Sequence, residues 1–164
     1  MTVRSGKFVA DHIESIDGRL SDEAIQANGL DLSIDRLYRI QGTPRLTNDD
    51  YDKGQRVEVK TEEDERGEYY QLSEGESYVA VYGEKIHIPE DHIGLVFPRS
   101  RLMRSGANVQ TAVWDSGYEG RGEGGLSVSH DIELNSDTRV AQMIFISTES
   151  LDEYYDGSHQ SERI

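Results

Sequence analysis

The chain has 164 residues, which is enough for one domain with a buried core. Its 32 acidic residues outnumber its 17 basic ones, so the formal net charge at pH 7 is -15. Such a surface repels a phosphate backbone, which excludes a nucleic-acid scaffold but leaves room for a small anionic ligand in a local pocket. The absence of cysteine excludes disulfides, zinc–thiolate sites and a cysteine nucleophile.

No stretch approaches the ~20 consecutive apolar residues of a membrane-spanning helix, and the first residues lack the apolar run of a secretory signal. We therefore expect a cytoplasmic protein without a membrane partner. The basic residues are mostly arginines, and the lysines are Lys7, Lys53, Lys60 and Lys85. An acidic, lysine-poor surface is typical of proteins that work in molar salt, where ions screen self-repulsion. We interpret the chain as halophilic; the alternative is an ordinary acidic domain.

The first thirty residues carry two predicted short helices. One begins near Lys7, where apolar residues are weakly periodic, and the other occupies residues 21–24 with Ser21 as its capping residue. From Leu30 onward the pattern changes to period two, which is typical of strands.

Short alternating runs, separated by Gly, Asp, Asn or Ser, indicate an all-β sandwich, barrel or jelly roll. The segment 43–68 is polar and acidic, and we expect a surface excursion with one brief strand rather than a linker. We find no repeat and no low-complexity linker, so we predict a single domain over residues 1–164. The predicted strands are 31–34, 57–59, 77–82, 85–89, 94–98, 109–114, 126–134 and 139–146.

The segment 98–125 is unusual for a plain β domain because it contains four arginines and six glycines. Arginine supplies forked donors that suit phosphate oxygens, and glycine lets backbone amides approach a ligand closely. A glycine-rich hairpin with surface arginines is the alternative interpretation. Spacing decides between them, because Asp115 directly follows a predicted apolar strand and precedes Tyr118 by three residues at a glycine turn. A carboxylate there can activate a water while the ring packs against a sugar, which outlines a nucleotide pocket.

Four segments in order resemble the motifs of the superfamily of dUTP diphosphatases and dCTP deaminases, and specifically its archaeal dUTPase branch, with a haloarchaeal composition. The resemblance implies a mainly β fold, a distorted jelly roll or β-clip of the dUTPase type with short N-terminal helices. The four segments are Asn28-Gly29-Leu30-Asp31-Leu32, Pro98-Arg99-Ser100 with Arg104 and Gly106, Asp115-x-x-Tyr118-x-Gly120, and Arg139-Val140-Ala141-Gln142-Met143-Ile144.

The resemblance implies an enzyme of pyrimidine deoxynucleotide metabolism that hydrolyses dUTP to dUMP and pyrophosphate, with water attacking the α-phosphorus. Asp115 would be the base that activates this water, and Tyr118 would lie beneath the deoxyribose. Asp31 would help place a hydrated Mg²⁺, which is held mainly by the substrate's phosphates. The residues implied to bind the substrate's phosphate chain are Arg99, Ser100, Arg101 and Gln142, together with Arg104, which is also a candidate for a subunit interface.

The resemblance further implies a homotrimer with active sites between subunits, and a C-terminal tail, residues 152–164, that can close over the substrate; the alternative for the tail is a frayed terminus. Two alternatives remain open. The first is a dCTP deaminase or a bifunctional dCTP deaminase/dUTPase, which needs a further glutamate where this chain has Gly125; Glu123 could substitute only if the hairpin shifts its register. The second is a catalytically silent nucleotide-binding protein, which would be expected to lack the base Asp115.

Overall fold

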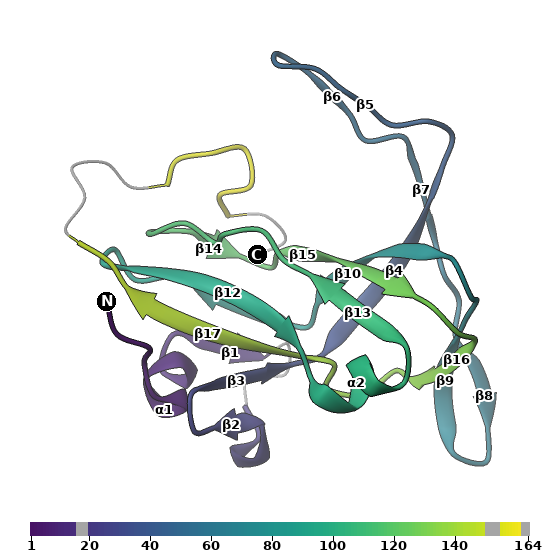
Figure 1. The fold of residues 1–164 in the computed structure, drawn as a ribbon, viewed down its shortest axis with the longest axis horizontal. Helices are drawn as coiled ribbons and strands as arrows, with labels where there is room; N and C mark the ends of the chain where they lie inside the picture. The colour runs from purple at the N-terminus through teal and green to yellow at the C-terminus, as the bar shows by residue number, and fades with distance from the viewer. Residues whose placement is uncertain (16–19, 150–154, 162–164) are drawn as a thin grey trace.

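The computed structural model describes residues 1–15, 20–149 and 155–161. The protein is mainly β, with antiparallel strands in a jelly-roll-like arrangement, as predicted (Figure 1). No helix in the described part of the chain is both long and apolar enough to cross a membrane. The helices are α1 (Gly6–Ala10), the 3₁₀ helix η1 (Asp22–Ala24) and α2 (Ser100–Arg104).

Two larger sheets enclose the core. The five-stranded sheet has the order β13 (Ala107–Gln110), β15 (Glu123–Val128), β10 (Ser77–Tyr82), β4 (Ile34–Gln41) and β7 (Gln55–Glu58). The four-stranded sheet has the order β12 (His92–Pro98), β17 (Ala141–Ser147), β3 (Gly29–Leu32) and β2 (Ile25–Gln26).

Three smaller sheets complete the fold. The first has the order β1 (Ile13–Ser15), β11 (Glu84–His87) and β14 (Glu119–Gly120). The second has the order β16 (Ile132–Asn135), β9 (Gly67–Leu72) and β8 (Glu62–Asp64). The third pairs β5 (Arg45–Leu46) with β6 (Tyr51–Asp52).

The core forms from the alternation of apolar residues along the strands. On β17, Met143 and Phe145 are fully buried, and Val96 on β12 and Leu32 on β3 are buried with them. Each such side chain is worth about 1.5–3 kcal/mol when it leaves water. The intervening residues of β12 and β17 are also apolar except for Gln142, so both faces of this pair are largely hydrophobic.

The predicted N-terminal helices are present, but the first is shorter than its periodicity indicates. It ends at Ala10, and Ile13 begins strand β1, where it pairs with the buried Ile86. Burial of two β-branched residues in a sheet outweighs a weak helical pattern. Ser21 caps η1 as predicted, because its hydroxyl accepts the Glu23 amide at 3.2 Å.

The prediction of one brief strand in residues 43–68 is wrong. Strands β4 and β7 pair and continue into β5 and β6, forming a long hairpin that stands away from the body, and β8 and β9 form a second hairpin (Figure 1). These hairpins are largely exposed to solvent, and most residues of β5 to β8 are exposed. The sequence there carries no apolar alternation, although backbone pairing is extensive.

Three other predicted strands differ from the structure. The run 31–34 is divided at Ser33 between β3 and β4, which lie in different sheets. The run 109–114 leaves the sheet after Gln110, and Trp114 instead pairs with Gly94 of β12. The run 126–134 is two strands, β15 and β16, separated by the polar residues 129–131. In each place the chain moves from one sheet to another, which a local pattern does not reveal.

Candidate active site

A tight turn carries the predicted base and the predicted sugar-contacting ring. The Tyr118 amide donates to the Asp115 carbonyl at 3.1 Å, and Gly117 between them has φ of +83°, a conformation that favours glycine. Ser116 fixes the turn to the interior, because its hydroxyl donates to the His92 carbonyl at 2.6 Å. The turn therefore holds Asp115 exposed and Tyr118 buried.

A cavity of about 130 Å³ lies beside this turn. Trp114 and Tyr118 form an aromatic wall, with ring centroids 5.1 Å apart and planes at 88°. Gly122 makes room for this wall, since a Cβ at that position would lie 2.1 Å from the Trp114 ring. Asp115 and Glu123 add carboxylates to the lining. An aromatic wall beside an exposed carboxylate suits a nucleoside with a reacting group next to it.

The described part of the C-terminal tail, residues 155–161, packs against the same turn. The Tyr155 amide donates to the Ser116 carbonyl at 2.9 Å, and the Tyr155 ring lies 5.7 Å from the ring of Tyr118. Tyr155 thereby becomes a further aromatic side chain of the small cavity. The rest of the predicted tail 152–164 lies outside the described residues.

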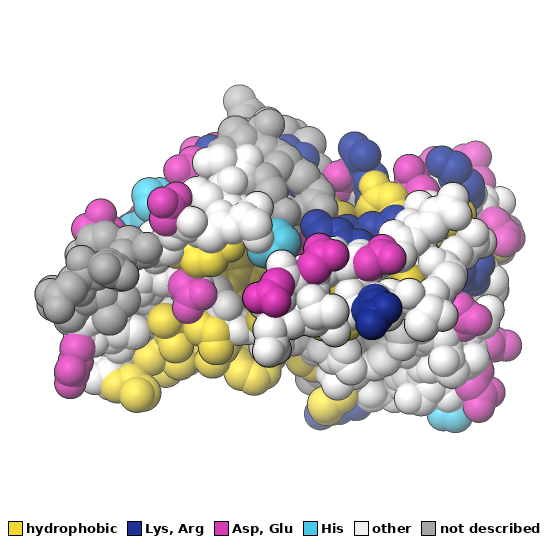
Figure 2. All heavy atoms as spheres, turned by 90° about the horizontal axis from the view of Figure 1, so that it is seen from above, with side chains coloured by type: hydrophobic (Ala, Val, Ile, Leu, Met, Phe, Trp, Pro, Cys, Tyr) yellow, Lys and Arg dark blue, Asp and Glu magenta, His cyan; other side chains and the backbone are white. Residues whose placement is uncertain are grey.

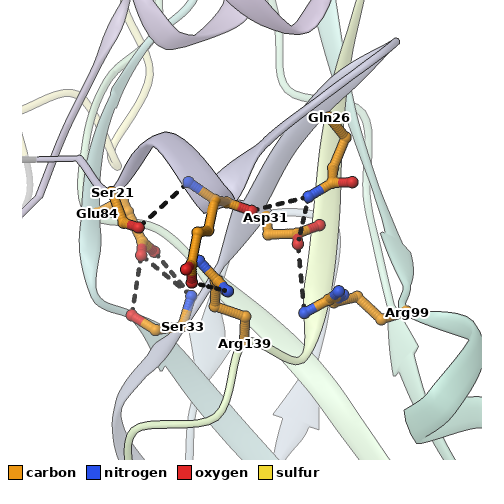
Figure 3. A network of polar contacts seen from close by, with 8 residues as sticks. Ser21, Gln26, Asp31, Ser33, Glu84, Arg99 and Arg139 are labelled. Atoms are coloured by element: carbon orange, nitrogen blue, oxygen red, sulfur yellow. Dashed lines mark hydrogen bonds and ion pairs between the residues drawn. The ribbon is translucent and has the colours of Figure 1, made fainter.

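A separate, larger cavity of about 580 Å³ contains three of the predicted substrate and metal residues: Asp31, Arg99 and Arg101. Asp31 comes from β3, and both arginines flank the start of α2. Figure 3 shows the polar contacts on this side of the molecule. The cavity is also lined by Ser21, Glu23, Ser33, Glu84 and Arg139.

Asp31 is almost fully buried and has two polar partners (Figure 3). Its Oδ2 lies 3.2 Å from Arg99 Nη1 and accepts a hydrogen bond from Gln26 Nε2 at 3.0 Å. Burial raises the pKa of the Asp31 carboxyl above its usual value, and the positive charges of Arg99 and Arg139 oppose this rise. The carboxylate is thus held in one position at the wall of the cavity.

Glu84 is a second buried carboxylate of the larger cavity, and the sequence analysis did not identify it. Ser33 supplies its contacts: the Ser33 hydroxyl donates to Oε1 at 2.8 Å, and the Ser33 amide donates to both carboxylate oxygens at 3.1 Å. Burial raises the pKa of Glu84 to about 7. A signal was available, because period two from the buried Ile86 places Glu84 on the inner face of β11.

Strand register places Gln142 next to the larger cavity. Gln142 of β17 stands opposite Asp31 of β3 on one side and opposite Phe97 of β12 on the other. Directly opposed residues of antiparallel strands share a face, so these three side chains lie on one face of the sheet. Ser100 and Arg104 are exposed at the two ends of α2, and neither lines either cavity among the described residues.

Within one chain the predicted base and the predicted phosphate-binding residues are not brought together. Asp115 and Tyr118 line the small cavity, whereas Arg99 and Arg101 line the large one. No described residue lines both. A single ligand contacts both sets only if it extends beyond one cavity, or if a second chain or a rearrangement of this one brings the two sets together.

Glu123, the candidate for the deaminase glutamate, lines the small cavity but is engaged by an arginine. Arg56 of β7 binds both of its carboxylate oxygens, at 2.5 and 2.9 Å. The position of the missing glutamate, Gly125, stands opposite Gln110, and a Cβ there would lie 2.8 Å from Gln110 Oε1. A proton relay at Gly125 is absent, and Glu123 has a structural partner.

Comparison with known proteins agrees with the fold and with the four motifs. Residues 3–148 match the family model described as dCTP deaminase-like. The chain belongs to this family. Its family members include a probable deoxyuridine 5'-triphosphate nucleotidohydrolase of Halobacterium salinarum, 41% identical over 96% of this chain and 93% of the relative. The predicted haloarchaeal branch is confirmed by this similarity.

More distant relatives extend the same pattern. A probable deoxyuridine 5'-triphosphate nucleotidohydrolase of Archaeoglobus fulgidus is 38% identical over 85% of this chain and 82% of the relative. The crystal structure of 2'-deoxycytidine 5'-triphosphate deaminase from Agrobacterium tumefaciens superimposes with a TM-score of 0.64 at 20% identity, covering 87% of this chain but only 47% of that longer one. The native EIAV dUTPase has a TM-score of 0.55 at 13% identity, covering 91% and 98%. At such identities the solved structures show the fold.

Proposed function

We propose that this protein hydrolyses dUTP to dUMP and pyrophosphate in the cytoplasm. The observation that carries the proposal is the turn with Asp115 exposed beside the aromatic cavity of Trp114 and Tyr118. The archaeal relatives named as deoxyuridine triphosphate nucleotidohydrolases support the same substrate.

In the proposed reaction Asp115 is the base that takes a proton from the attacking water, and Tyr118 packs against the deoxyribose. Arg99, Ser100, Arg101, Arg104 and Gln142 neutralise and orient the phosphate chain. Phosphoanhydride hydrolysis depends on positioning, charge neutralisation and one activated water, so no covalent nucleophile is required. The absence of cysteine is compatible with this chemistry.

The donor set of the larger cavity fits a hydrated Mg²⁺. Asp31 offers a fixed carboxylate at the cavity wall, and the described residues contain no cluster of three or more metal-ligating side chains. Mg²⁺ keeps several waters and is commonly held by one or two carboxylates plus the substrate's phosphates. When bound, the ion would neutralise charge on the phosphate chain, while Asp31 would orient its water shell.

A homotrimer with sites between subunits accounts for the separation of the two cavities. Its support in this chain is an apolar outer face on β12 and β17, formed by the opposed pairs Ile93–Ile146 and Leu95–Ile144 and by Phe97, which is 48% exposed. Hydrophobic side chains gather at the end of the molecule where β12 and β17 lie (Figure 2). A contiguous apolar face of this kind marks an association surface. Gln142 lies on the same face, so a second chain docked there would reach the phosphate-binding residues.

Deamination of dCTP is the competing function, and two observations argue against it. Gly125 occupies the position of the relay, and two hydrogen bonds from Arg56 hold both carboxylate oxygens of Glu123. The deciding experiment incubates the protein with Mg²⁺ and either dUTP or dCTP. We expect pyrophosphate from dUTP and no ammonia from dCTP. Ammonia from dCTP at a comparable rate would refute the monofunctional proposal, and absence of both products would refute the hydrolase.

A further inference from the structure

The larger cavity contains an arginine, Arg139, whose partner differs from that of Arg99. Arg139 Nη2 lies 3.5 Å from Oε2 of Glu23, and both side chains line the cavity. The guanidinium side chain is 28% exposed, whereas the Glu23 side chain is 83% exposed. A partly buried cation is therefore paired with an anion that stands largely in water.

The segment that carries Glu23 is a short helix at the edge of the cavity, anchored in the core by the buried Ala24. Glu23 belongs to the three-residue helix η1, and its amide is capped by Ser21. Its carbonyl accepts Gln26 Nε2 at 3.0 Å, and the same nitrogen donates to Asp31. A continuous series of polar contacts thus joins Arg139 to Asp31 along one wall of the cavity.

The two carboxylates of this series are held very differently. Asp31 lies on a strand at 2% exposure and contacts both Arg99 and Gln26. The Glu23 carboxylate forms a long ion pair at the surface, and such exposed pairs contribute little because water competes for both charges. A phosphate group offers arginine several charged oxygens in a geometry that matches its fork. It can therefore replace the exposed carboxylate of Glu23, whereas Arg99 keeps its contact with the buried Asp31 when it binds phosphate.

We propose that Arg139 is a polyphosphate-binding residue of this cavity and that the Glu23 carboxylate is its exchangeable counterion, displaced when a phosphate chain enters. Glu23 then lowers the affinity for the phosphate chain and keeps Arg139 in place between binding events. The inference rests on the proposed function only for the identity of the substrate as dUTP. Binding of a phosphate chain to Arg139 does not depend on turnover.

The test is calorimetric titration with inorganic pyrophosphate alone, without Mg²⁺, at a salt concentration where circular dichroism shows a folded protein. We expect Glu23→Gln to bind pyrophosphate about two- to fivefold more tightly, the range that corresponds to loss of an exposed ion pair. The matched control is Asp22→Asn, which removes the same charge from the same short helix but at a side chain that is not among the described residues lining the cavity. It should change the affinity much less.

A second pair of variants tests whether the tighter pyrophosphate binding of Glu23→Gln requires Arg139. Arg139→Gln should weaken pyrophosphate binding, and adding Glu23→Gln to it should give no gain. If Arg139→Gln does not fold, Arg139→Lys serves, because it keeps the charge but lacks the fork and should also bind more weakly.

Four results would overturn the proposal: no pyrophosphate binding by the parent protein, no gain in Glu23→Gln, an equal gain in Asp22→Asn, or a gain that persists when Arg139 is replaced. The outcome is separable from that of the proposed function. If the protein shows the expected titrations but does not hydrolyse dUTP, this inference stands and the proposed hydrolase function is refuted. If it hydrolyses dUTP but does not show the expected titrations, the hydrolase function stands and this inference is refuted.

Discussion

Asp31 Oδ2 lies 3.2 Å from Arg99 Nη1, and the carboxylate of this pair is 2% exposed while the guanidinium side chain is 36% exposed. Arg99 thus supplies charge to a carboxylate that has little exposure, and Arg99 is itself open to the cavity. The same arginine is a proposed phosphate ligand, so one side chain joins the interior of the fold to the substrate.

Arg99→Gln is expected to destabilise the fold at neutral pH by about 2 kcal/mol, because it leaves a buried carboxylate with only Gln26 and the more distant Arg139 as compensation. The measurement is denaturant unfolding at pH 7. The double variant Arg99→Gln/Asp31→Asn should recover most of the lost unfolding free energy, since no unpaired buried charge then remains. Equal stability of Arg99→Gln and the parent protein would show that the pair contributes nothing to the fold.

Glu84 should make stability fall as pH rises. Its folded-state pKa of about 7 exceeds the ordinary value of 4.5, so between these values the folded chain binds a proton that the unfolded chain releases. Stability from this group is fully present below pH 4.5 and is lost as pH passes through 7, with a limit of roughly 3 kcal/mol. We expect Glu84→Gln to gain stability relative to the parent protein between pH 5 and pH 8 in parallel unfolding curves. A difference that does not vary with pH would contradict the prediction.

Tyr118 is expected to discriminate against ribose, because a ring packed on the sugar leaves no room for a 2′-hydroxyl. Tyr118→Ala should lower the ratio of the dUTP hydrolysis rate to the UTP hydrolysis rate. It should also cost about 3 kcal/mol of stability, since the ring is buried against Trp114 and Tyr155. Tyr118→Phe, which keeps the ring, should retain the ratio. A folded alanine variant with an unchanged ratio would limit Tyr118 to a role in packing.

The turn from Asp115 to Tyr118 was predictable because its determinants are local. A glycine in the third position and a carboxylate three residues before an aromatic ring lie within a few residues of one another, although the strand predicted to precede them ends at Gln110. The capping serine Ser21 is local in the same sense. In these segments the short-range preferences agree with the tertiary fold.

Other features depend on pairing between distant segments. The outer part of the β4 to β7 hairpin has no apolar alternation because most of its residues are exposed, so its pairing is invisible to periodicity. The contact of Arg56 with Glu123 joins residues 67 positions apart. The division of the candidate site into two cavities follows from topology, which places β3 and β14 in different sheets. The spacing of residues along the chain does not show which distant segments pair in space.

Asp115→Asn should lower the rate of dUTP hydrolysis by ~10²–10⁴, the usual loss when a general base is removed. The side chain is exposed, so the change should leave the melting temperature nearly unaltered. Pyrophosphate binding should also persist, because the larger cavity is intact. Steady-state kinetics with dUTP and calorimetry with pyrophosphate check both parts, and unchanged turnover would remove Asp115 from the mechanism.

Two inactive variants should restore each other's activity if the site lies between chains. Asp115→Asn retains the phosphate-binding cavity, and Arg99→Gln retains the turn with the base, so a mixed assembly contains some sites with both intact parts. Random assembly of equal amounts gives about one intact site in four. Co-refolded mixtures should therefore reach about a quarter of the parent rate, whereas the variants refolded separately should not.

The expected destabilisation of Arg99→Gln is smaller than the ~5–15 kcal/mol stability of ordinary domains, so this variant should still fold and assemble. Phe97→Asp, on the outer face of β12, is the control: it should give a smaller species by light scattering and abolish the complementation. A mixture no more active than its components, in assemblies shown to contain both chains, would place the whole site within one chain and require the two cavities to approach by rearrangement.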